Sequence, residues 1–167
     1  MTDIAASVRE FLDLTVTDVT AEIALDRHCA ALLKQFHQQL LAEGIDALEA
    51  GSAAHGADYF SRDFAVGHCR RHPADIDAGA IRAFAGHWYI TRNLEPNLEE
   101  LSAILQGVSL FYTFLHQHSV IDDDHLEQAR AHCCALDYYR ERIDSFWELD
   151  PDGYNRWCTD CPLPPQR

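Results

Sequence analysis

The clearest pattern in the chain is a run of hydrophobic residues at intervals of three and four between residues 97 and 121. This spacing lines the hydrophobic side chains along one side of a 3.6-residue helix, whereas a strand would alternate. Asn97, followed three residues later by Glu100, is typical of a capped helix start. The sequence therefore predicts a central helix over 97–121, in which Gly107 permits the close approach of a neighbouring helix. The hydrophobic stripe consists of Leu98, Leu101, Ile104, Leu105, Val108, Phe111, Tyr112 and Leu115.

The same spacing predicts further helices, and no candidate strand is longer than about five residues. Gly44 is placed to end a long helix, residues 45–56 read as a connection, and the chain after Pro151 shows no hydrophobic period. We therefore expect an all-α, single-domain bundle of five or six helices, with a helical domain over 1–150 and an irregular C-terminal tail over 151–167. The expected helices cover 2–13 with Thr2 as its cap, 17–43, 59–67, 75–92, 97–121 and 122–146.

Charge restricts the classes of partner that the chain can have. The 167 residues carry 13 basic and 27 acidic side chains, for a net charge of -14, which repels nucleic-acid phosphates and anionic membranes. Residues 60–92 are locally basic, with five arginines against three aspartates. These arginines are candidates for nucleic-acid binding if the chain binds DNA, although a solvated face is the simpler interpretation: Arg62, Arg70, Arg71, Arg82 and Arg92.

The sequence also favours a cytoplasmic location without a membrane span. No hydrophobic run approaches the roughly 18 residues of a transmembrane helix, and no basic start precedes a hydrophobic core as in a signal peptide. In a reducing cytoplasm, the six cysteines are expected to be free thiols or metal ligands rather than disulfide-bonded.

Two short motifs suggest a metal site. Cys69 and His72 are followed by a proline, as are Cys158 and Cys161, and each pair places two metal-competent side chains three positions apart at a turn. Structural zinc sites present their ligands in this way, so the four residues would form a tetrahedral Cys3His zinc site if the two turns met. The alternative is that Cys69 is a buried small hydrophobic residue, His72 lies on the surface, and the two tail cysteines are free.

Residues 59–121 resemble the helical core-binding, SAM-like domain that precedes the catalytic domain of tyrosine recombinases. The resemblance lies in the order of an aromatic helix, a capped helix and a longer helix, carried by DYFSRDF, DIDAGAIRAFAGHWYI and NLEELSAILQGVSLFYTFLHQHSVI. It implies a DNA-clamping fold without the recombinase catalytic domain, which this chain has no room to contain.

No complete set of catalytic residues is visible in the sequence, which favours a non-enzymatic protein. The leading hypothesis is a cytoplasmic accessory domain that binds a protein partner, with no cofactor. A zinc-stabilised domain and a DNA-binding domain are the alternatives. Because side chains from different helices cannot be placed together from sequence, a histidine and carboxylate pocket with enzymatic activity also stays open.

Overall fold

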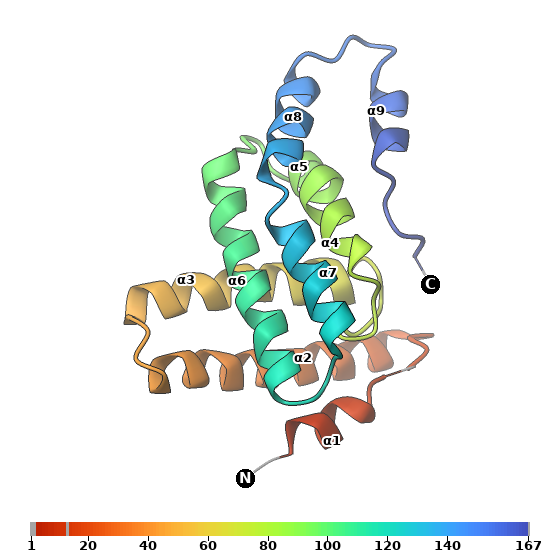
Figure 1. The fold of residues 1–167 in the computed structure, drawn as a ribbon. Helices are drawn as coiled ribbons and strands as arrows, with labels where there is room; N and C mark the ends of the chain where they lie inside the picture. Colours follow the sequence, from red (N-terminus) through yellow and green to blue (C-terminus); the bar gives the residue numbers. More distant parts are fainter. Residues whose placement is uncertain (1–2, 13, 167) are drawn as a thin grey trace.

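The computed structural model describes residues 3–12 and 14–166, which are all-helical and contain no strand (Figure 1). Two of the elements, η1 and η2, are π-helical; η1 continues α3, and η2 joins α4 to α5, so the described residues form eight continuous helical segments rather than five or six. None of these helices is long and apolar enough to cross a membrane. The elements are α1 (Ile4–Arg9), α2 (Val19–Ala42), α3 (Ala47–Asp58), η1 (Tyr59–Val66), α4 (Gly79–Ala83), η2 (Phe84–Trp88), α5 (Tyr89–Arg92), α6 (Leu98–Gln117), α7 (Asp123–Cys133), α8 (Leu136–Trp147) and α9 (Tyr154–Asp160).

The predicted central helix is confirmed as α6, and it starts where its cap predicts. The Asn97 side chain accepts a hydrogen bond from the Glu100 amide at 2.8 Å. Gly44 adopts a left-handed conformation, φ +86°, and ends α2 as expected. The expected helix over 2–13 is observed as α1; its predicted cap, Thr2, lies outside the described residues, and Asp3 caps the helix through the Ala6 amide instead.

The prediction that 45–56 is a connection is wrong, because this segment forms most of α3. Helices α2 and α3 run antiparallel, and α6 crosses them (Figure 1). At the α3–α6 contact, a Cβ on Gly107 would overlap the carbonyl oxygen of Ala53, and one on Gly56 would lie 2.7 Å from the carbonyl oxygen of Ile104. The glycines that lower helix propensity in α3 and α6 therefore allow their backbones to touch.

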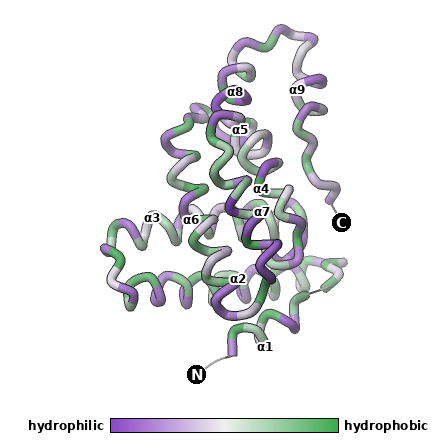
Figure 2. Tube along the Cα trace, viewed as in Figure 1, coloured by the Kyte–Doolittle hydropathy of each residue, from purple (hydrophilic) through white to green (hydrophobic). Residues whose placement is uncertain are grey.

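The two π-helical segments face each other through aromatic rings. Phe60 and Phe64 of η1 pack against Phe84 of η2 with ring centroids 5.2 and 5.4 Å apart, and Phe64 also packs against Trp88 at 5.5 Å. A π-helix is wider than an α-helix and frequently occurs at functional sites. Hydrophobic residues are dense along α6, whereas α7 and α8 are richer in hydrophilic ones (Figure 2).

The expected single helix over 122–146 is divided into α7 and α8. The division falls at Cys134 and Ala135, and Ala135 has φ -77° and ψ 47°, outside the helical region. The Tyr139 hydroxyl donates to the carbonyl oxygen of His132 at 2.6 Å and bridges the break. Neither glycine nor proline marks this position, so no local signal predicts it.

The segment expected to be an irregular tail contains α9, which packs against α8 and η2. Arg142 of α8 is buried; its Nε donates to the carbonyl oxygen of Gly86 at 2.8 Å, and its Nη2 donates to that of Trp157 at 2.9 Å. The Arg142 guanidinium also lies 3.7 Å from the centre of the Trp157 ring. We call the contacts among Gly86, Arg142 and Trp157 the tail clasp. They explain why α9 is ordered despite three prolines after it.

We expect the close α3–α6 contact to make Gly107→Ala destabilising. The helix-propensity gain of about 1 kcal/mol is smaller than the cost of separating two backbones, so the free energy of unfolding should fall by about 2 kcal/mol. Urea denaturation followed by circular dichroism measures this change. Gly51→Ala is the matched control, because a Cβ there meets nothing within 4 Å, and it should leave stability unchanged or raise it by up to about 1 kcal/mol. Equal stability of both variants would contradict the account.

Candidate functional site

The proposed zinc ligands do not come together. Cys69 and His72 are buried at the end of η1 and in the following loop, and burial raises the pKa of the Cys69 thiol to about 11. Cys158 lies in the last turn of α9, and the Cys161 Sγ is 3.7 Å from the carbonyl oxygen of Arg82. Among residues 3–12 and 14–166, no group of three or more His, Cys, Asp or Glu side chains is placed to hold a metal, and all six cysteines are free.

The tail does reach the Cys69 region, but through its prolines rather than through its cysteines. Residues 162–165 and Cys69 line the same small pocket of about 370 Å³. His72, which was expected on the surface if it bound no metal, is instead buried. Its Nδ1 accepts a hydrogen bond from the Ala74 amide at 3.0 Å, so this nitrogen already has a partner.

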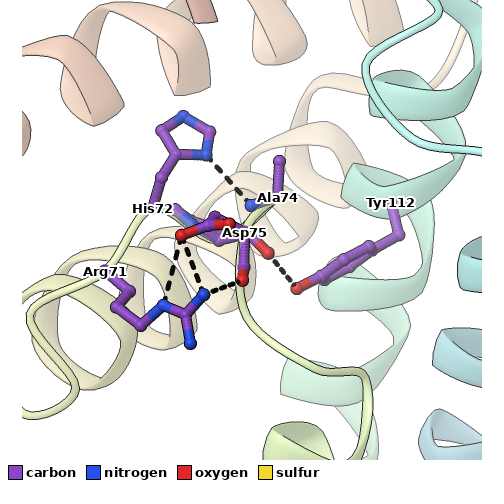
Figure 3. A network of polar contacts seen from close by, with 6 residues as sticks. Arg71, His72, Ala74, Asp75 and Tyr112 are labelled. Atoms are coloured by element: carbon purple, nitrogen blue, oxygen red, sulfur yellow. Dashed lines mark hydrogen bonds and ion pairs between the residues drawn. The ribbon is translucent and has the colours of Figure 1, made fainter. Parts of the chain in front are cut away.

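A loop network fixes the chain between η1 and α4 (Figure 3). Arg71 donates to the Asp75 carboxylate at 2.9 Å and to the Asp75 carbonyl oxygen at 2.6 Å. The Tyr112 hydroxyl of α6 donates to the carbonyl oxygen of Pro73 at 2.7 Å. These bonds satisfy backbone and charged groups in the loop and hold it against the central helix.

Four of the five candidate DNA-binding arginines are engaged within the chain. Arg62 donates two 2.9 Å hydrogen bonds to Asp26 of α2 and one of 3.2 Å to Asp58, and these bonds raise the pKa of its guanidinium. Arg71 pairs with Asp75, as described above. Arg82 lies over the Tyr138 ring at 4.2 Å, and Arg92 over the Trp88 ring at 5.4 Å.

The fifth arginine, Arg70, is exposed in a left-handed turn with φ 56°. Arginines that bind carboxylates or cover aromatic rings in their own chain have less to offer a phosphate backbone. The arrangement therefore favours a structural role for most of the locally basic stretch.

The described residues form an open groove of about 810 Å³, which we call the α2–α5 groove. It lies between the first turns of α2, the π-helix η1 and the end of α5, and Gln166 of the tail lies at its edge. Its lining consists of Val19, Glu22, Ile23, Asp26, Arg62, Asp63, Val66, Gly67, His68, Trp88, Arg92 and Gln166.

The α2–α5 groove contains charges of both signs. Glu22 and Asp63 make no ion pair with any described residue, and burial, followed by the nearby Asp58 carboxylate, raises the pKa of Asp63. Arg92, which also lines the groove, lies over the indole of Trp88. The Asp26 and Arg62 charges offset each other. The lining therefore offers two carboxylates without an ion-pair partner and one pair of a cation and an aromatic ring.

His68 contacts both the aromatic cluster and the tail. Its ring stacks on Phe64 with centroids 5.6 Å apart and planes inclined by 11°. Burial, and then the charges of Arg92 and His87, lower its pKa, so His68 is neutral at pH 7. Its Nδ1 lies 3.3 Å from the Gln166 side-chain nitrogen, which can donate to it.

Residues of α2 complete the groove, and they were not among the predicted site residues. Val19 and Ile23 are 70% and 45% exposed, and they lie off the buried stripe of α2. Their hydrophobic character on an otherwise polar face was the available signal in the sequence. The polar groups that line the groove are carboxylates, two arginines, a histidine and the Gln166 amide, and the described lining contains no Ser, Thr, Cys or Lys.

Comparisons with known proteins add no functional information: no family model, no curated protein and no solved structure matches this chain. The resemblance of residues 59–121 to recombinase core-binding domains therefore stays a prediction.

We expect burial of His72 to make stability depend on pH. Burial, and then the adjacent His28, lower the His72 pKa from 6.5 to about 3, so the unfolded chain binds a proton that the folded chain excludes. The free energy of unfolding is therefore not reduced by His72 above pH 6.5. As the pH falls from 6.5 toward about 3, protonation of His72 in the unfolded chain lowers it by about 1.4 kcal/mol per pH unit.

Urea denaturation of wild type and His72→Asn over this pH range measures the effect. Asparagine retains an acceptor near the Ala74 amide but does not titrate, so the slope of the unfolding free energy against pH should be shallower. His55→Asn, at an exposed position of α3, should keep the wild-type slope. Identical slopes for all three proteins would show that His72 titrates normally in the fold.

Proposed function

We propose that this chain is a non-enzymatic module that binds a peptide segment of a partner protein in the α2–α5 groove. The observation that carries the proposal is the combination of a hollow with exposed hydrophobic residues at its rim. The exposed Val19 and Ile23 line the groove together with the acidic Glu22, and Trp88 and Arg92 belong to the same lining. Hydrophobic side chains exposed next to a polar groove are typical of protein-binding surfaces.

The size and charges of the groove define the segment that fits. Its volume of about 810 Å³ is within the range of about 300–1,000 Å³ found for ligand sites. A basic side chain would pair with Glu22 and Asp63, a hydrophobic side chain would cover Ile23, and a carboxylate would reach Arg92. We therefore expect a short segment that presents a basic residue, a hydrophobic residue and an acidic group close to one another.

The location of the groove on two π-helical segments supports this proposal. Arg62, Asp63 and Val66 come from η1, and Trp88 comes from η2. Aromatic contacts between η1 and η2, such as that of Phe64 with Trp88, hold these two segments at fixed positions. Little side-chain and backbone entropy is then lost when a peptide binds. All six cysteines are free thiols, and we keep the cytoplasm as the expected compartment.

The test is a peptide array probed with the full chain, followed by fluorescence anisotropy with the best binding peptide. Ile23→Asp replaces a hydrophobic contact at the groove by a charge and should weaken binding by at least about tenfold. Arg92→Gln should weaken the binding of peptides that contain an acidic residue. It should leave the affinity for peptides without an acidic residue unchanged.

Leu48→Asp is the matched control, because Leu48 is 86% exposed on α3 and does not line the groove. It should bind as wild type does. If the array gives no binding peptide, or if Ile23→Asp and Leu48→Asp behave alike, the groove is not the binding site. Circular dichroism should show the same helix content for all variants, because each change lies on the surface.

A further inference from the structure

A second surface, at the end formed by α8 and α9, consists of four adjoining aromatic rings. Trp147 packs against Phe146 with centroids 5.8 Å apart, Phe146 against Trp157 at 5.1 Å, and Trp157 against Tyr154 at 6.4 Å. We call these four residues the aromatic ridge. It lies at the far end of the molecule from α1 (Figure 1), and none of its residues lines the α2–α5 groove.

The outer rings of the ridge are open to solvent, while its inner rings are anchored. Trp147 is 58% exposed and Tyr154 is 47% exposed, whereas Trp157 is buried. The Trp157 Nε1 donates to the Ser145 hydroxyl at 3.1 Å, and its ring lies against Arg142 in the tail clasp. The exposed rings therefore stand on a fixed base, and a partner can cover them at low cost in side-chain entropy.

The surroundings of the ridge are strongly acidic. From residue 144 to residue 152, the chain carries four carboxylates and no basic residue: Asp144, Glu148, Asp150 and Asp152. All four are exposed, and none forms an ion pair with a described residue. The nearest cation along α9 is the single exposed Arg156. A ridge of exposed aromatic rings among negative charges complements a cationic ligand.

We propose that the aromatic ridge is a docking surface for an arginine-containing, cationic segment of a partner protein. An arginine guanidinium stacks on the Trp147 face as Arg142 stacks on Trp157, and neighbouring basic side chains pair with the carboxylates. Tryptophan is the side chain with the strongest cation–π attraction and is enriched among residues that dominate interfaces. The ridge and the α2–α5 groove are separate sites, so either can exist without the other.

Fluorescence anisotropy with a labelled synthetic peptide of alternating arginine and serine tests the ridge. Wild type should bind this peptide and not its counterpart with glutamine in place of arginine. Trp147→Ala should weaken binding by about tenfold or more, and Trp147→Phe should weaken it less, because a phenyl ring keeps part of the cation–π attraction. Ile23→Asp, in the groove, should bind the peptide as wild type does.

Two further variants separate docking from general electrostatic attraction. The triple change Asp144→Asn, Glu148→Gln and Asp150→Asn should reduce affinity and flatten its salt dependence. The matched triple change Glu43→Gln, Glu95→Gln and Glu99→Gln removes the same charge at exposed positions elsewhere and should retain most of the binding.

Equal losses in the two triple variants, or unchanged binding of Trp147→Ala, would overturn the proposal. So would self-association of wild type in light scattering that Trp147→Ala abolishes, since the ridge would then be covered by a second copy of the chain. Leu94→Ala, which removes a hydrophobic side chain that is 96% exposed and lies outside the ridge, should have no effect on peptide binding.

Discussion

The backbone contact between α3 and α6 is the constraint on which the rest of the structure depends. Gly107 faces the Ala53 carbonyl and Gly56 faces the Ile104 carbonyl, so the two helices cross with no side chain between them. Because η1 continues α3 without a break, this crossing also fixes where the rings of Phe60 and Phe64 lie. The segment η2 packs on those rings, and its position fixes where Trp88 and the following helix α5, with Arg92, enter the groove.

Side chains also donate hydrogen bonds to the carbonyl groups of η2 and of Tyr89, the first residue of α5. The donors are Arg142 to Gly86, Asn93 to Tyr89, and the Thr91 hydroxyl, whose single hydrogen is shared between His87 and Trp88. The Gly86 carbonyl in η2 is thus the point at which Arg142 attaches α8. The same segment that lines the groove thus also holds the tail, and the two features share one support.

Local signals account for what the sequence predicted. The α6 stripe, the Asn97 cap and the Gly44 end depend on residues within a few positions of one another, and all three are confirmed. Helix α3 was missed because Gly51 and Gly56 lower helix propensity, and the reason for Gly56 is a contact with a helix nearly fifty residues away. The division between α7 and α8, at Ala135, has no local signal at all.

The site was harder to predict than the fold for the same reason. Arg62 and Arg92 were identified, but the carboxylates of Asp26 and Asp58 that bind Arg62, and the exposed Ile23, come from other helices. The Cys3His set had suitable spacing within each half, yet whether the halves meet depends on tertiary packing, and the tail presents its prolines to Cys69 instead. Spacing predicts which residues share a turn, and only the fold decides which turns become neighbours.

The tail clasp gives a way to recognise distant relatives of this chain. Each of its residues has its own reason to be retained: a Cβ at Gly86 would lie 3.1 Å from the Cys161 Sγ, and a lysine at Arg142 could not donate to two carbonyl groups and cover the Trp157 ring at once. A small residue, an arginine 56 positions later and a tryptophan 15 positions after that form a spacing signature. A relative that keeps this triplet keeps the contacts that hold α9 against α8 in this chain.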